Sequence, residues 1–170
     1  MPSWVTYGLM AIVTYYLVTI IQTFLHRAVA HWRRGGIVFL NHVTCHHRNY
    51  RGRQMLSECY IEDELNVTPW FLPPALAVSC IGYLLLPLDL FVAHALTMCA
   101  AFWAHVYLHA QYHVDGSWLT RFRWFRRKRQ LHFVHHRHMD SNFGVIEFVW
   151  DKCFGTFRDA AARDEFALDP

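Results

Sequence analysis

The chain begins with a continuous apolar segment. Residues 1–25 contain no Asp, Glu, Lys or Arg, and the run from Trp4 to Leu25 is long enough to cross a hydrocarbon core of roughly 30 Å as a helix. A cleaved signal peptide would have a basic residue before the apolar run and a small-residue cleavage site after it. This segment has neither, so we predict a membrane helix over residues 4–25.

A second apolar segment covers residues 67–104, with Asp89 as its only Asp, Glu, Lys or Arg. It is too long for one crossing, which takes about 20 residues, so we predict two helices, over residues 71–86 and 90–108. Pro87–Asp89 would form the turn between them, because proline interrupts helices and aspartate favours turns. A buried hairpin in a soluble bundle is disfavoured, because both helices would be apolar on every face.

Composition and charge extend this prediction to the whole chain. The sequence is 54% hydrophobic and only 17% charged, which is apolar for a soluble protein of this size. The sixteen Lys and Arg residues are confined to residues 27–53 and 121–163. By the positive-inside rule both blocks are cytoplasmic and the N-terminus is outside.

The predicted fold class is therefore all-α. We expect one integral-membrane domain over residues 1–170, with about three transmembrane helices and a cytoplasmic helical cap formed by residues 26–66 and 109–157. Aromatic residues interleave with arginines in residues 121–129. Nucleic acid is one conceivable partner for such a stretch, but next to a membrane the headgroups of anionic lipids are favoured, so we expect membrane lipids and no nucleic acid as partners.

Thirteen histidines are present, and most lie in four clusters. Neutral imidazole is the commonest nitrogen ligand of transition metals, and a structural zinc site needs about four ligands. Ten or more clustered histidines therefore predict two metals that share one site. The clustered histidines are His26 and His31; His42, His46 and His47; His105, His109 and His113; and His132, His135 and His136.

Helical spacing predicts which histidines face the same way. Residues three and four apart share one face of an α-helix, so we expect His132, His135 and His136 to point together. His42 and His46 are expected to align for the same reason.

The two remaining pairs differ from each other in spacing. His109 and His113 are four residues apart and are expected to align at the cytoplasmic end of the third span, with His105 one turn deeper. His26 and His31 are five residues apart, roughly 140° around an α-helix. That pair fits only if the helix ends or bends between them, or if the two histidines serve different metals.

Some neighbouring residues are expected to have other roles. His94 is isolated and is predicted to pack, His105 is either a ligand or a supporting residue, and His138 would point away from its cluster. Cys45 lies inside a histidine cluster, where a small filler is favoured over a ligand. Carboxylates are expected to orient the imidazoles through hydrogen bonds, and the candidates are Glu58, Glu62, Asp63, Glu64, Asp140 and Asp151.

The C-terminal half adds a more specific pattern. His132-x2-His135-His136 is followed by Asn142-Phe143-Gly144 and then by Trp150-Asp151-x2-Phe154-Gly155-Thr156. With the other histidine spacings, this succession resembles the fatty acid hydroxylase/sterol desaturase superfamily of integral-membrane non-haem di-iron enzymes. The resemblance covers about residues 24–157. The chain departs from the common pattern by one extra residue between His42 and His46, and it has no fused cytochrome-like domain.

The resemblance implies a dinuclear centre with two Fe ions, for which Zn can substitute in purified protein, and O2 as co-substrate. It implies no catalytic residues beyond the metal ligands. Electrons would come from a separate ferredoxin-like or cytochrome-like donor with its reductase. The implied ligands are His26, His31, His42, His46, His47, His109, His113, His132, His135 and His136.

The function implied by the resemblance is an O2-dependent oxygenase that hydroxylates or desaturates an unactivated C–H bond of a lipid-like substrate. A hydroxylase of a smaller apolar metabolite, such as a terpenoid, carotenoid or natural-product intermediate, is the nearest alternative. A membrane metal-binding or transport protein is the alternative outside enzymes. It is disfavoured because the histidines gather on one side of the membrane, whereas a transport path needs polar groups across the midplane.

Overall fold

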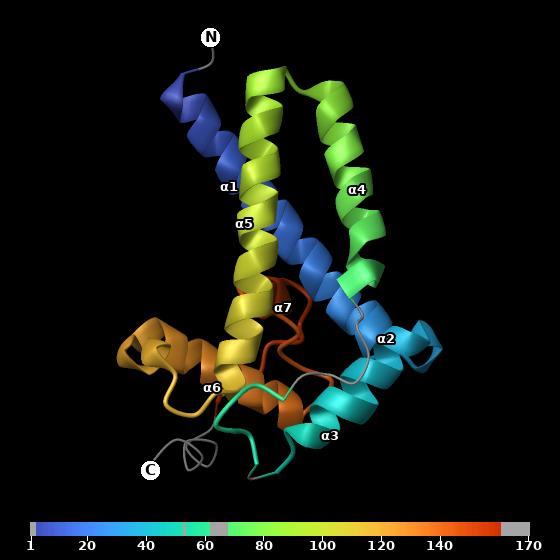
Figure 1. The fold of residues 1–170 in the computed structure, drawn as a ribbon, viewed down its shortest axis with the longest axis vertical. Coiled ribbons are helices and arrows are strands. Elements are labelled where there is room, and N and C mark those ends of the chain that lie inside the picture. Colours follow the sequence, from blue (N-terminus) through green and yellow to red (C-terminus); the bar gives the residue numbers. More distant parts are fainter. Residues whose placement is uncertain (1–2, 53, 62–67, 161–170) are drawn as a thin grey trace.

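The computed structural model describes residues 3–52, 54–61 and 68–160, and these residues form helices and no β-strand. Three long helices make up one end of the molecule: α1 (Trp4–Leu25), α4 (Thr68–Leu85) and α5 (Leu88–His113). Helix α5 packs against both α1 and α4, and the shorter helices gather at the opposite end (Figure 1). The all-α prediction is confirmed for the described residues.

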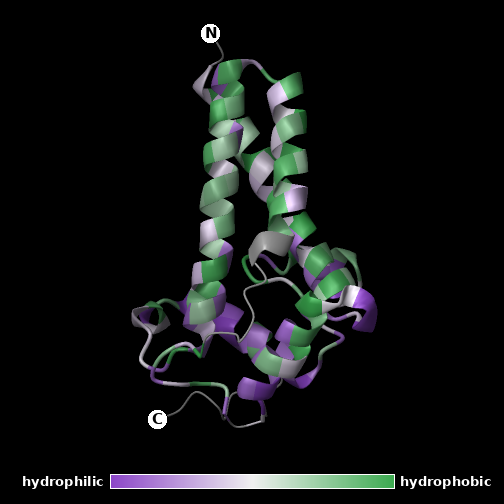
Figure 2. Ribbon diagram, turned by 45° about the vertical axis from the view of Figure 1, so that its right-hand side comes forward, coloured by the Kyte–Doolittle hydropathy of each residue, from purple (hydrophilic) through white to green (hydrophobic). Residues whose placement is uncertain are grey.

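The long helices are apolar over most of their surface, whereas the short-helix end carries most of the hydrophilic residues (Figure 2). Two helical segments, Trp4–Ala30 and Leu88–His113, are long and apolar enough to cross a membrane. The apolar part of α4, Phe71–Leu85, is shorter. The first predicted span coincides with α1, and a crossing by α4 stays a prediction.

Helix α5 is longer at both ends than the predicted span of residues 90–108. Pro87 is its N-cap with φ −55°, so Leu88 and Asp89 belong to the helix and not to the turn. Proline has a φ suited to a helix start, and an acidic residue in the first turn is favoured by the helix dipole. Asp89 also accepts a hydrogen bond of 2.8 Å from the Tyr7 hydroxyl, which joins α5 to the start of α1.

His94 lies where the three long helices meet. Its Nδ1 is 2.8 Å from the Thr14 hydroxyl oxygen on α1. On its other side Gly82 of α4 comes so close that a Cβ there would lie 2.9 Å from Cδ2 of His94. His94 therefore holds helices together, in the packing position predicted for it.

The chain after α1 folds back as a short helical hairpin. A π-helix, η1 (His26–Ala30), is followed by the 3-10 turn η2 (Arg33–Gly35), by α2 (Ile37–Phe39), by a second π-helix, η3 (Leu40–His46), and by α3 (His47–Asn49). The reversal needs glycine at two positions. A Cβ on Gly35 would lie 1.9 Å from the carbonyl oxygen of Val29, and Gly36 has φ +61°, a conformation that glycine adopts without strain.

The remaining helices are η4 (Trp118–Arg121), α6 (Arg123–Arg137) and α7 (Val149–Cys153). Helix α6 crosses beneath the end of α5 (Figure 1). The buried Arg129 fixes this crossing, because its guanidinium donates to the carbonyl oxygens of Tyr112 (2.8 Å) and Val114 (2.6 Å) at the end of α5. Cationic side chains stabilise helix C-termini in this way.

Candidate metal centre

The first π-helix brings His26 and His31 onto one face. The main-chain N–H of His31 donates to the carbonyl of His26 at 3.1 Å, the i to i+5 hydrogen bond that defines a π-turn. The Nε2 atoms of both residues approach Nε2 of His42, at 2.7 and 3.1 Å. The expected separation of roughly 140° assumed α-helical geometry, so the change of helix type resolves the predicted conflict.

The second π-helix changes a predicted pairing. The main-chain N–H of His47 donates to the carbonyl of His42, so these two histidines align, with Nε2 atoms 3.2 Å apart. His46 was expected to align with His42. Their rings do stack, with centroids 5.2 Å apart, but Nε2 of His46 faces a different histidine, His136, at an Nε2 to Nε2 distance of 3.1 Å. The α-helical spacing of four residues thus predicted that the two rings lie side by side, but not which histidines they meet in a π-helical segment.

Helix α6 borders two sets of histidines. His132 and His136 are four residues apart and approach each other, with Nε2 atoms at 3.1 Å. His135 instead approaches His31 on the other side, with Nε2 atoms at 3.1 Å. The three histidines of α6 therefore do not point to one place, although all are buried.

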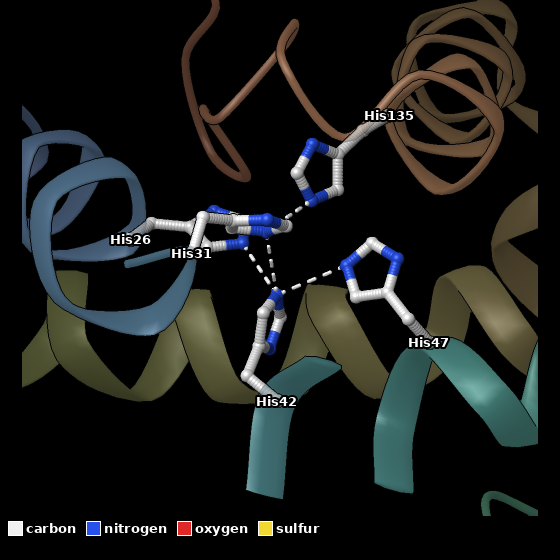
Figure 3. A group of neighbouring side chains, drawn as sticks. All are labelled: His26, His31, His42, His47 and His135. Carbon is white, nitrogen blue, oxygen red and sulfur yellow. Dashed lines mark hydrogen bonds between the residues drawn. The ribbon is translucent and has the colours of Figure 1, made fainter. Parts of the chain in front are cut away.

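Nine of the ten predicted ligands form two adjacent groups. Within each group the potential ligand atoms all lie within 4.8 Å of one another. The His26 group consists of His26, His31, His42, His47 and His135 (Figure 3). The His46 group consists of His46, His113, His132 and His136.

The two groups share a boundary, and His109 lies beside the second. The rings of His47 and His136, one from each group, stack with centroids 4.2 Å apart. His109 belongs to neither group, but its ring centroid is 4.5 Å from that of His46 and 4.9 Å from that of His132. Ligation by all ten histidines stays a prediction.

Backbone carbonyls fix the tautomer of several rings. A carbonyl oxygen can only accept, so each Nδ1 beside one carries the proton and the opposite Nε2 presents its lone pair. These Nδ1–carbonyl pairs are His26 with Phe143 (2.6 Å), His135 with Ser141 (2.7 Å), His136 with Tyr50 (3.0 Å) and His113 with Met55 (3.0 Å).

This arrangement fits a metal pair. A hydrogen bond between the Nε2 atoms of two imidazoles needs a proton on one of those atoms. The four rings that donate from Nδ1 to a carbonyl have no proton on Nε2, so they cannot be the donors. Two nitrogens that are each about 2.1 Å from a shared ion would lie about 3 Å apart at a right angle. The Nε2 to Nε2 contacts within the groups range from 2.7 Å (His26–His42) to 3.2 Å (His42–His47). One cation in each group would satisfy the converging lone pairs.

The site also keeps its imidazoles in the form that binds metals. Burial, and then repulsion from His26 and His113, lowers the pKa of His47 to about 3. Burial and neighbouring histidines hold the pKa of five others well below the usual value: His42, His46, His132, His135 and His136. Neutral imidazole, which these shifts favour, is the ligating form.

Asp151 organises the loop that positions His26. Its two carboxylate oxygens accept from the main-chain N–H groups of Phe143 and Gly144, both at 2.8 Å, and Oδ1 also accepts from the Thr156 hydroxyl at 2.7 Å. The carbonyl of Phe143 in turn accepts from His26. A fully buried carboxylate thus acts on the site through the main chain.

The rest of the C-terminal motif serves the same loop. Asn142 has φ +52°, and its side chain bonds the carbonyls of Leu131 (3.1 Å) and Arg158 (2.8 Å). Gly144 has no room for a side chain, since a Cβ would lie 2.1 Å from the carbonyl oxygen of Glu147. Trp150 donates to the Thr19 hydroxyl at 2.9 Å, which attaches α7 to α1.

The carboxylates predicted to orient imidazoles have mixed outcomes. Asp151 supports His26 indirectly, while Glu58 and Asp140 are exposed. Glu62, Asp63 and Glu64 lie outside the described residues. Main-chain carbonyls instead bond the Nδ1 atoms of His26, His113, His135 and His136, and the sequence could not identify them because every residue has a carbonyl.

Three further predicted positions lie outside both groups. His105 is stacked on His109, with ring centroids 6.3 Å apart, and its buried Nδ1 has no hydrogen-bond partner in the part of the chain that the structure describes. His138 caps the end of α6. Cys45 is buried with its sulfur 4.0 Å from the Thr44 hydroxyl oxygen, and none of the five cysteines, all of which lie in the described residues, forms a disulfide.

A cavity of about 600 Å³ reaches the histidines from between the long helices. Its apolar lining comes from α1, α4 and α5, for example from Val18, Val78 and Phe102. His26 and His42 of the His26 group line the same cavity. An apolar molecule inside it would therefore lie next to the metal-binding face of the site.

Comparison with known proteins agrees with this geometry. The sequence model of the fatty acid hydroxylase family matches residues 7–156, which include both histidine groups and the Asp151 loop. No curated protein and no solved structure is significantly similar to the chain. The matched region covers most of the 170 residues, and the protein is thus a member of the fatty acid hydroxylase family.

Proposed function

We propose that this protein is an O2-dependent di-iron membrane oxygenase that hydroxylates or desaturates an unactivated C–H bond of a lipid-like substrate. The observation that carries the proposal is the contact between the apolar cavity and the histidines. His26 and His42 belong to a group of five converging imidazoles and also line the cavity. A site for apolar molecules and a site for metal therefore share a wall.

The metal ions supply one part of the chemistry: two bound Fe ions activate O2 for attack on a C–H bond. The chain's own residues do the rest. The Nε2 atoms of the two groups hold the ions, and the Nδ1–H donors to Phe143, Ser141, Tyr50 and Met55 keep the rings in orientation. The apolar lining excludes water and determines which carbon of the substrate lies beside the metals.

The proposed membrane placement follows from the apolar helices and the basic blocks. Helices α1, α4 and α5 cross the bilayer, with the N-terminus outside and the histidine groups on the cytoplasmic side. Exposed arginines such as Arg33 and Arg126 would lie at that surface, where anionic lipids attract them. A separate ferredoxin-like or cytochrome-like donor, reduced by its own reductase, brings electrons from the cytoplasm.

The proposal is tested with iron-loaded protein in lipid nanodiscs. We expect isotope-labelled oxygen from O2 to appear in a lipid or small apolar metabolite if the reaction is a hydroxylation, and loss of two hydrogens if it is a desaturation. Metabolite profiles of cells with and without the gene identify the compound. Wild-type protein that binds iron but consumes no O2 beyond a His135→Ala control, with reductant and a total lipid extract present, contradicts the proposal.

A further inference from the structure

Gln22 is an unpartnered polar group beside an apolar cavity. It lies on α1 and lines the cavity. Its Oε1 and Nε2 are both buried, and neither has a hydrogen-bond partner among the described residues. A buried amide without partners is destabilising, and such groups are rare enough in folded proteins to call for an explanation. The missing partner is most simply a group on a molecule inside the cavity.

His105 offers a second polar group on another helix. It lines the same cavity from α5, and no described residue bonds its buried Nδ1. Gln22 precedes His26 by four residues and His105 precedes His109 by four, so each lies about 6 Å along its helix from a predicted ligand. The cavity therefore has a polar position one helical turn away from the metal-binding face.

The remaining lining restricts what can bind there. None of the described residues around the cavity is Asp, Glu, Lys or Arg, so a charged headgroup at the Gln22 position would be buried with no charged side chain beside it, which is unfavourable. A pure hydrocarbon would leave the Gln22 amide unsatisfied. A hydroxyl both donates and accepts, so it can bond Oε1 and Nε2 of the amide together.

We propose that the cavity binds a hydrophobic alcohol, whose uncharged hydroxyl is held by Gln22 with His105 beside it while its apolar body extends to the histidine groups. This inference rests on the proposed function, because it names the substrate class of the same site. It makes Gln22 a specificity-determining residue. The oxidised carbon then lies several bonds away from the hydroxyl, since Gln22 is one helical turn from His26.

The test is competition binding in nanodiscs, with radiolabelled hexadecanol as the tracer. The competitors are two matched pairs, hexadecanol with hexadecane and farnesol with farnesane, together with palmitate as a charged probe. For wild-type protein we expect the better alcohol to bind roughly tenfold more tightly than its hydrocarbon, the size of one net hydrogen bond at its upper range. Palmitate should bind more weakly than hexadecanol.

The variant Gln22→Leu replaces the amide with an apolar group of similar size. It should weaken alcohol binding without weakening hydrocarbon binding, so that the preference disappears. His105→Phe should reduce the preference in part. Gln54→Leu, at an exposed position, is the matched control and should keep the wild-type preference. Metal content and thermal unfolding of each variant establish that it is folded.

Two results overturn the inference. One is equal binding of alcohol and hydrocarbon by the wild type in both pairs, which would mean that water satisfies Gln22. The other is an unchanged preference in folded Gln22→Leu. Because binding needs no turnover, the two proposals fail separately: alcohol preference without O2-dependent product contradicts the proposed function alone, and product without alcohol preference contradicts this inference alone.

Discussion

Nδ1 of His26 lies 2.6 Å from the carbonyl oxygen of Phe143, a contact between the end of the first long helix and a loop 117 residues later in the chain. The same loop is held by the carboxylate of Asp151, which accepts from the main-chain N–H of Phe143. The orientation of a predicted metal ligand therefore depends on a carboxylate that acts through the main chain of Phe143.

Asp151→Asn should weaken metal binding without removing a ligand. An amide offers one acceptor in place of two, so either Phe143 or Gly144 loses its hydrogen-bond acceptor and the carbonyl facing His26 shifts. We expect metal affinity to fall by roughly 10–100-fold, measured by metal titration of the purified protein. Asp140→Asn, at an exposed position, is the control and should bind metal as the wild type does. Equal affinities in the two variants would contradict this role of Asp151.

Two metal ions per chain are expected in wild-type protein, because the histidines form two groups. His135→Ala removes an imidazole from the His26 group and should lower the metal content by about one ion per chain and abolish O2-dependent turnover. His138→Ala, three residues later and outside both groups, should change neither. Elemental analysis with an O2-uptake assay measures both. A wild type saturated by one tightly bound ion would rule out a dinuclear centre.

Gly35→Ala should disrupt the hairpin that carries His31 and His42. The added Cβ would lie 1.9 Å from the carbonyl oxygen of Val29, so the main chain has to move. We expect a loss of about 1–3 kcal/mol in the free energy of unfolding together with reduced metal content. Gly8→Ala has open space around its Cβ and lies within α1, so it should be neutral or stabilising. Thermal unfolding of the two variants side by side makes the comparison.

Acid should destabilise the metal-free protein. His47 has its pKa lowered from 6.5 to about 3 in the folded state, so the unfolded chain binds more protons between these values. The contribution of His47 to stability is complete above pH 6.5 and is lost as the pH falls toward 3, at about 1.4 kcal/mol per pH unit. The unfolding temperature, measured from pH 7.5 to 4, should fall steadily below 6.5. A His47→Asn variant should show a shallower decline, and an identical slope would contradict the assignment.

His94→Ala tests the helix contact that lies away from the metals. The variant loses the hydrogen bond to Thr14 and leaves a space beside Gly82, so we expect a loss of about 1–3 kcal/mol in stability. Metal content should stay at the wild-type value, because His94 lies outside both groups. Denaturant unfolding and elemental analysis of the same preparation measure the two effects. A drop in metal content in the folded variant would show that His94 supports the site.

The long helices could be predicted from sequence because their apolar runs are continuous and their charges are absent. The predicted span of residues 4–25 coincides with α1. Helix α5 continues past the predicted span of residues 90–108, because its last turns, up to His113, carry polar residues that lower the hydropathy without interrupting the helix. Arg129 then satisfies the carbonyls at that end, a contact that depends on tertiary structure.

The histidines of the site could be predicted as a set, but their grouping could not. The α-helical rule placed His42 beside His46, and their rings do stack, but in the π-helix Nε2 of His42 meets that of His47. The carbonyls that bond the histidines, such as that of Phe143, also could not be predicted. Every residue has a main-chain carbonyl, and the sequence does not indicate which one lies beside a histidine. The cavity arises between helices far apart in the chain, so its polar position at Gln22 became apparent only in the fold.

The two π-helices tie the spacing of the histidines to the type of helix between them. Relative to an α-helix, a π-turn carries one extra residue, so His26 and His31 share a face although four residues separate them, and the same holds for His42 and His47. Deleting one of the intervening residues would return the turn to α-helical geometry, in which positions four apart share a face, so each pair would stay aligned. Relatives with one residue fewer in residues 27–30 or 43–45 are therefore expected to hold the same pairs of histidines on an α-helical turn.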